Sequence, residues 1–87
     1  MKILIIEVDK IQNDVLASFL EKEGYETFSA YTLGEAYVIL DKQAIKLILL
    51  DSTLPNGNGF NFLKNLKLTA HVPVIVRAPF KNGVTPK

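Results

Sequence analysis

Short apolar runs and segments with helical periodicity alternate along the chain. Three runs, at residues 2–6, 45–50 and 73–76, are almost continuously apolar and rich in β-branched side chains. This pattern is typical of parallel strands that are covered on both faces. A more polar run at residues 25–30 predicts a fourth strand.

Helical signals lie between these predicted strands. The first helix is indicated by apolar residues recurring every four positions and by Gly24, which stands where a helix commonly ends. Thr32 and Glu35 have the spacing of a capping box and predict the start of a second helix. A third helical pattern, 60–67, follows the turn-rich segment 54–59. The apolar stripe of the first helix consists of Ile11, Val15, Leu16, Phe19 and Leu20.

Strands that alternate with helices indicate an α/β domain with a parallel sheet. We find no internal repeat or break in composition, so residues 1–78 are expected to form one domain and residues 79–87 an irregular tail. A chain of 87 residues has room for one modest core.

Composition narrows the possible functions. The formal net charge of +1 is too balanced for a protein that recognises nucleic acid or anionic membranes by charge alone. The chain has no cysteine, which excludes a disulfide scaffold and a thiolate metal site. Its apolar runs are far too short to cross a bilayer. We therefore expect a cytoplasmic protein that binds neither nucleic acid nor membrane.

Three carboxylates follow predicted strands: Glu7 and Asp9 after the first, and Asp51 after the third. Ligands of open parallel sheets bind beyond the carboxyl ends of the strands. If these strands are neighbours, the carboxylates converge, which raises a pKa or favours a hard cation with oxygen ligands. The alternative for each residue is a charge that marks where a strand reaches water.

Several motifs together resemble the receiver domain of bacterial two-component response regulators. The resemblance covers residues 1 to about 76, in the order and spacing of that family. Its most specific part is an aspartate after an apolar strand, followed by Leu-Pro and then Gly-Phe. The motifs are Lys2-Ile-Leu-Ile-Ile-Glu7, Glu23-Gly-Tyr-Glu26, Leu47-Ile-Leu-Leu-Asp51, Leu54-Pro55, Gly59-Phe60 and Pro73-Val-Ile-Val76.

The resemblance implies a flavodoxin-like, doubly wound parallel sheet of four strands with three helices, which lacks the fifth β/α unit of the family. It makes Asp51 the counterpart of the aspartate that accepts a phosphoryl group from a histidine kinase. It also implies a Mg²⁺ site formed by Glu7, Asp51 and the backbone carbonyl of Thr53, with Asp9 as a further candidate ligand. The expected function is a signalling module rather than an enzyme.

The sequence departs from the family pattern at the positions that support phosphoryl transfer. Val8 stands where the family has an acidic metal ligand, and Asp9 lies one residue out of register. Ala78 aligns with the hydroxyl residue after the fourth strand, and the lysine of a fifth strand has no counterpart. We therefore predict a degenerate receiver with weak or absent phosphorylation of Asp51.

The alternative is a phosphorylation-independent interaction or dimerisation module, or the remnant of a longer receiver. A sheet without the last β/α unit exposes an edge and an apolar face, which favours self-association or a partner protein that completes the sheet. Two other features are interpreted as structural: His71 as a solvated loop residue and 56–59 as a turn before a helix, because that segment lacks the spacing of a phosphate-binding loop.

Overall fold

The computed structural model describes residues 1–51 and 72–77. In this part of the chain, four strands and two helices follow one another as β1 (Lys2–Ile6), α1 (Lys10–Lys22), β2 (Glu26–Ala30), α2 (Leu33–Lys42), β3 (Leu47–Asp51) and β4 (Val74–Arg77). The predicted helix at 60–67, the end of the predicted domain at residue 78 and the predicted tail lie outside the described residues. The four strands were all predicted, with ends that differ by no more than two residues.

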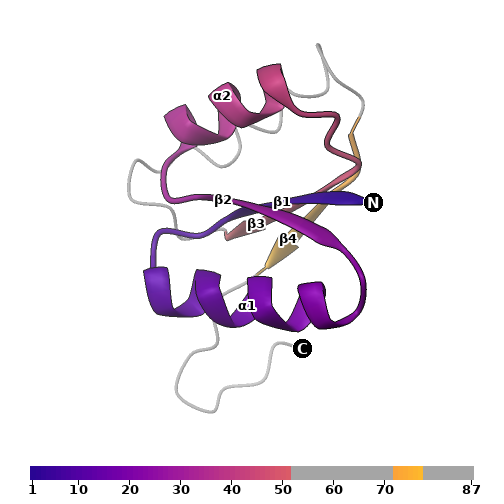
Figure 1. Ribbon diagram of the computed structural model, residues 1–87. Helices are drawn as coiled ribbons and strands as arrows, with labels where there is room; N and C mark the ends of the chain where they lie inside the picture. The colour runs from indigo at the N-terminus through magenta and orange to yellow at the C-terminus, as the bar shows by residue number, and fades with distance from the viewer. Residues whose placement is uncertain (52–71, 78–87) are drawn as a thin grey trace, which may run out of the picture.

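The strands form one parallel sheet in the order β2-β1-β3-β4. Figure 1 shows α1 on one side of this sheet and α2 on the other, so the described part has three layers. From β1 the chain passes to β2 on one side and then crosses to β3 on the other side. The order of the strands therefore reverses between β1 and β3, which is where open parallel sheets bind ligands.

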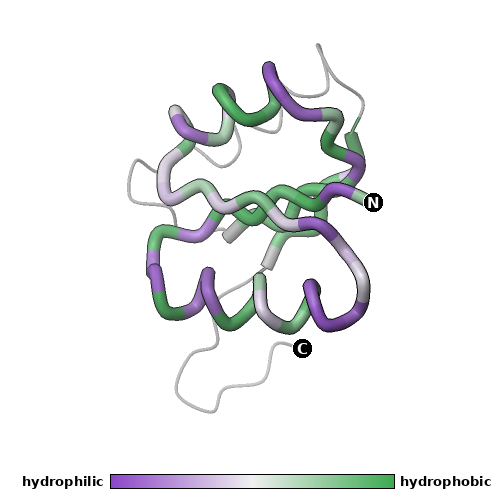
Figure 2. Tube along the Cα trace, in the orientation of Figure 1, coloured by the Kyte–Doolittle hydropathy of each residue, from purple (hydrophilic) through white to green (hydrophobic). Residues whose placement is uncertain are grey.

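The main core lies between the sheet and α2. Alternate residues of each strand point towards this helix, as the period of two in a strand requires. Figure 2 shows β1 and β3 as the most continuously hydrophobic segments of the trace. The buried residues of this core are Leu4, Ile6, Ala30, Ala36, Ile45, Ile48 and Leu50, and Phe28, Leu33, Ile39, Leu40, Val72 and Val74 pack partly buried against them.

The central strand β1 is covered on both faces. All four residues from Ile3 to Ile6 are at most 1% exposed. Full burial of a side chain of this size contributes roughly 1.5–3 kcal/mol. Such two-sided burial explains why this strand is a continuous apolar run rather than an alternating one.

The apolar stripe expected on α1 is buried only in part. Leu16 and Leu20 are half-buried, whereas Ile11, Val15 and Phe19 are 75%, 59% and 61% exposed. Phe19 belongs to the apolar stripe by its spacing, but it is not a core residue of the described part of the chain. Helical periodicity identifies a shared face, but it does not reveal whether another element covers that face.

Local interactions fix the ends of both helices. Gly24, the second residue after α1, has φ +95°, the left-handed conformation that commonly ends a helix. The hydroxyl oxygen of Thr32 accepts a hydrogen bond from the backbone N–H of Glu35 at 3.1 Å, as the capping box predicts. The carboxylate of Glu35 reaches back to the N–H of Tyr31 at 2.7 Å, one residue before the expected position. No helix of the described residues is long and apolar enough to cross a membrane.

Candidate functional site

The carboxyl ends of β1 and β3 lie side by side, so the condition set in the sequence analysis is met. These two strands pair in parallel, and the last pair in register is Ile6 with Leu50. Glu7 comes directly after Ile6, and Asp51 comes directly after Leu50 as the last residue of β3. Their backbones therefore lie next to one another, at the point where the strand order reverses. Asp51 is in turn paired with Arg77 of β4. The register thus brings together the two acidic residues with counterparts in the receiver pattern.

Glu7 is a buried residue, with 4% of its surface exposed. Its backbone N–H donates to the carbonyl of Ala30 at 3.0 Å, which ties the end of β1 to the end of β2. Its side-chain Oε2 accepts a hydrogen bond from the backbone N–H of Asp9 at 3.1 Å. A buried carboxylate requires such partners, because taking a charge out of water is costly. The carboxylate of Glu7 is therefore held in place by the turn that follows β1.

Val8 and Asp9 occupy different surroundings from Glu7. Val8 is 40% exposed and brings an apolar side chain to the position of the family's acidic metal ligand. Asp9 is the N-cap of α1, and its Oδ1 accepts from the backbone N–H groups of Ile11 at 2.9 Å and Gln12 at 3.1 Å. A carboxylate at this place satisfies free N–H groups and complements the helix dipole. The structure therefore shows that Asp9 caps the N-terminus of α1. Its role as a metal ligand stays a prediction.

Asn13 is a residue of the site's surroundings that the sequence analysis missed. It is fully buried on α1, and its Nδ2 donates to the carbonyls of Glu7 at 3.2 Å and of Ala30 at 3.4 Å. Its Oδ1 accepts from the hydroxyl of Ser29. The side chain of Asn13 on α1 is thus hydrogen-bonded to the backbone at the ends of β1 and β2, next to Glu7. The signal was present, because Asn13 lies at helical spacing from Leu16 and Leu20 and so is a polar residue on the sheet-facing side.

Other predicted site residues lie outside the described part of the chain. These are the backbone carbonyl of Thr53 and Ala78, which stands at the hydroxyl position of the family. The turn 56–59 and His71, which were interpreted as structural, also lie outside it. Within the described side chains, no group of three or more histidine, cysteine, aspartate or glutamate residues is arranged to hold a metal ion. The described side chains among the predicted Mg²⁺ ligands are those of Glu7 and Asp9. Of these two, Glu7 lies at the carboxyl end of β1 next to Asp51, whereas Asp9 caps α1.

A parallel sheet with this strand order, with a buried acidic residue after β1 beside an aspartate that ends β3, defines a receiver-type α/β domain. The family model of the response regulator receiver domain matches residues 3–82. The chain therefore belongs to the response regulator receiver family of two-component signalling, and the predicted resemblance and flavodoxin-like fold are confirmed.

Curated relatives are response regulators. The transcriptional regulatory protein CpxR of Escherichia coli (strain K12) is 37% identical over 75 residues, which is 86% of this chain and 32% of that protein. The regulatory protein VanRc of Enterococcus gallinarum is 32% identical over the same shares of both chains. The chain thus spans about a third of the length of the curated relatives that it matches.

Solved structures agree with this assignment. The MaeR response regulator bound to beryllium trifluoride has a TM-score of 0.82 and 35% identity, with 94% of this chain and 70% of that one covered. A two-component response regulator from Clostridium difficile has a TM-score of 0.86 and 29% identity, with coverage of 95% and 69%. Receiver domains of this family bind Mg²⁺ for phosphorylation and interact with histidine kinases.

Proposed function

We propose that this chain is a receiver module of phosphorelay signalling in which Asp51 is the phosphoacceptor and phosphorylation is weak or absent. The observation that supports this most is the parallel register of β1 and β3, which puts the backbones of Glu7 and Asp51 side by side. We propose the cytoplasm as its location and a histidine kinase as the donor of the phosphoryl group.

The chemistry follows from the residues at this edge of the sheet. An oxygen of the Asp51 carboxylate is a nucleophile for phosphorus, and the bond from phosphorus to the nitrogen of the donor's phosphohistidine breaks as the new bond forms. Catalysis of phosphoryl transfer depends on positioning and on neutralising negative charge. Glu7, Asp51 and the carbonyl of Thr53 offer hard oxygen donors of the kind that Mg²⁺ prefers. The ion would supply the neutralising charge.

Weak phosphorylation is expected because two supporting positions have lost their polar groups. Val8 offers no oxygen to a cation, and Asp9 directs Oδ1 to the N–H groups of α1. Ala78 offers no hydroxyl to the phosphoryl group. Loss of one preorganised donor commonly reduces a rate by roughly 10²- to 10³-fold. Two such losses predict a reaction several orders of magnitude slower than that of a receiver with both groups.

The test is phosphorylation by acetyl phosphate with Mg²⁺, followed by intact-mass measurement over time. We expect little or no addition to the native chain and faster addition to the Val8→Asp variant, which restores an acidic side chain after Glu7. A Val8→Asn variant is the matched control for size and polarity without charge. Asp51→Asn in the Val8→Asp background should abolish the addition. Rapid stoichiometric phosphorylation of the native chain would contradict the proposed weakness.

A second candidate function is a phosphorylation-independent interaction module that keeps the receiver fold. The observation that favours it is the exposed apolar surface of the described residues, which includes Val15, Phe19 and Ile75. Titration with Mg²⁺ followed by NMR separates the two functions. Saturable shifts at Glu7 and Asp51 support a receiver that retains its metal site, whereas a module without phosphoryl chemistry should show none.

A further inference from the structure

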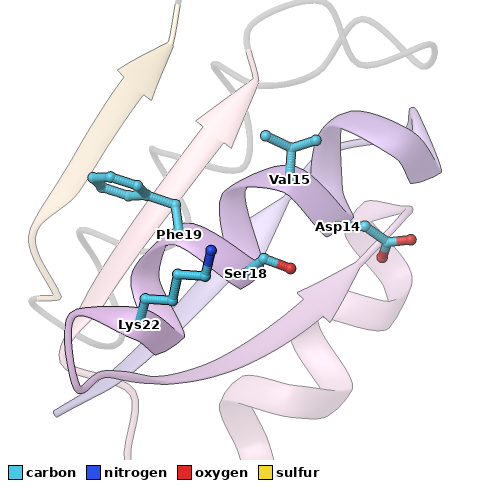
Figure 3. Close-up of a pocket in the computed structure, with 5 residues that line it drawn as sticks. All are labelled: Asp14, Val15, Ser18, Phe19 and Lys22. Carbon is cyan, nitrogen blue, oxygen red and sulfur yellow. The ribbon is translucent and has the colours of Figure 1, made fainter.

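The exposed side of α1 carries a compact apolar surface between opposite charges. Val15 and Phe19 are one turn apart and are 59% and 61% exposed. They line a shallow hollow together with Asp14, Ser18 and Lys22. Figure 3 shows Asp14 towards one end of this hollow, Lys22 towards the other end and Ser18 between them. We refer to these five residues as the α1 surface.

The α1 surface carries opposite charges at its two ends, so two copies of it are complementary when they are packed antiparallel. Asp14 and Lys22 lie four residues before and four residues after Ser18, so each is about 6 Å along the helix axis from the midpoint, at a rise of about 1.5 Å per residue. If a second α1 is laid antiparallel across the first at Ser18, Asp14 meets the partner's Lys22 and Lys22 meets the partner's Asp14. A parallel arrangement brings like charges together instead.

The sizes of the side chains suit the same arrangement. Ser18 is a small residue at the crossing point, where packed helices come within about 8–10 Å of each other. Beside it, Phe19 meets the partner's Val15, and Val15 meets the partner's Phe19. Such contacts remove from water apolar surface that the single chain leaves exposed. The two-fold axis makes every favourable contact occur twice, as in other isologous interfaces.

We propose that the α1 surface is an interface between two copies of this chain, formed by antiparallel packing of α1 on α1 around a two-fold axis at Ser18. The argument for a second copy is the charge order, because Asp14, Ser18 and Lys22 complement their own arrangement without another partner. This interface does not depend on Asp51 and goes beyond the proposed phosphoacceptor function.

Crosslinking offers a direct test because the chain contains no cysteine. In a Ser18→Cys variant, the two thiols of the proposed dimer lie at the axis, within reach of a disulfide. We expect a disulfide-linked dimer to form under a mild copper–phenanthroline oxidant and to disappear on reduction. The control is Asp41→Cys, an exposed position on α2, which should crosslink much more slowly. Equal rates for the two variants would overturn the proposal.

Charge reversal tests the geometry independently. In sedimentation velocity over the micromolar range, the native chain should show a reversible dimer. Asp14→Lys alone or Lys22→Asp alone should weaken it by roughly tenfold or more, because each reversal converts two attractions into repulsions. The double variant Asp14→Lys with Lys22→Asp should recover most of the affinity. Phe19→Glu should leave a folded monomer, as judged by circular dichroism.

Three results would refute the proposed interface. A native chain that stays monomeric throughout the range excludes it. A dimer that persists in Phe19→Glu places the contact elsewhere, for example along the edge of the sheet at β4. A double charge variant no tighter than the single variants excludes the antiparallel pairing of Asp14 with the partner's Lys22.

Discussion

Replacement of Asn13 by leucine should destabilise the protein, although leucine is more apolar and a better helix former. Asn13 is fully buried and makes three hydrogen bonds, to the carbonyls of Glu7 and Ala30 and from the hydroxyl of Ser29. The carbonyl of Ala30 keeps a second donor, the N–H of Glu7 at 3.0 Å. The principal losses are therefore the hydrogen bond to the Glu7 carbonyl and the one from the Ser29 hydroxyl.

The magnitude follows from these two losses. The hydrogen bonds to the Glu7 carbonyl and from the Ser29 hydroxyl contribute about 0.5–1.5 kcal/mol each, and the space that alanine leaves in the core adds a further cost. We expect Asn13→Ala to lower the free energy of unfolding by about 2–4 kcal/mol and Asn13→Leu by about 1–3 kcal/mol, since leucine recovers part of the loss through apolar burial. A domain of this size has a total of roughly 4–13 kcal/mol.

Urea denaturation and thermal melting followed by circular dichroism provide the measurement. Each kcal/mol corresponds to roughly 4–8 °C in Tm for a domain of this length. All variants are compared at one protein concentration, because self-association adds to the apparent stability. Asp41→Ala, at an exposed helical position, is the control and should stay within about 0.5 kcal/mol of the native chain. An Asn13→Leu variant as stable as the native chain would refute the role given to these hydrogen bonds.

Three further pairs of substitutions test the local interactions and the core. Asp9→Ala should cost about 1 kcal/mol through loss of the α1 cap, whereas Asp9→Asn should cost little because asparagine caps equally well; the urea midpoints of the two variants decide this. Gly24→Ala should destabilise by about 1–2 kcal/mol because of its positive φ, whereas Gly34→Ala, inside α2, should stabilise by about 0.5–1 kcal/mol; equal signs in thermal melts would contradict this reasoning. Leu4→Ala should cost about 2–5 kcal/mol in urea titrations, against less than about 0.5 kcal/mol for Val38→Ala on the exposed side of α2.

The strands and helix ends could be predicted because each depends on a few neighbouring residues. Continuous apolar runs reveal strands that are buried on both faces, and Ile3 to Ile6 are such a run. Gly24 and Thr32 predicted helix ends because a left-handed residue and a hydroxyl cap act within one turn of the chain. The sequence left open whether the strands before Glu7 and Asp51 are neighbours, and the pairing of β1 with β3 is what places the backbones of these residues side by side.

Features that depend on contacts between several helices and strands could not be predicted from the sequence alone. The buried role of Asn13 requires the carbonyls of Glu7 and Ala30 to meet at one point, and these residues are 23 positions apart. Phe19 has the spacing of a core residue, but its exposure depends on what covers that side of α1. For Asp9, a metal ligand and a helix cap require the same residue type, and its hydrogen bonds to Ile11 and Gln12 are what reveal the capping role.

The central position of β1 has a consequence for synthesis of the chain on the ribosome. Leu4 pairs with Ile48, which is 44 positions later in the sequence. At about 5–20 residues per second, roughly 2–9 seconds pass between the synthesis of these two residues. During that time the apolar segment from Ile3 to Ile6 can gain β2 as a neighbour, but β3 has yet to emerge. The first strand to be made is thus one of the last to be completed, and it is the segment of the nascent chain on which we expect chaperones to act.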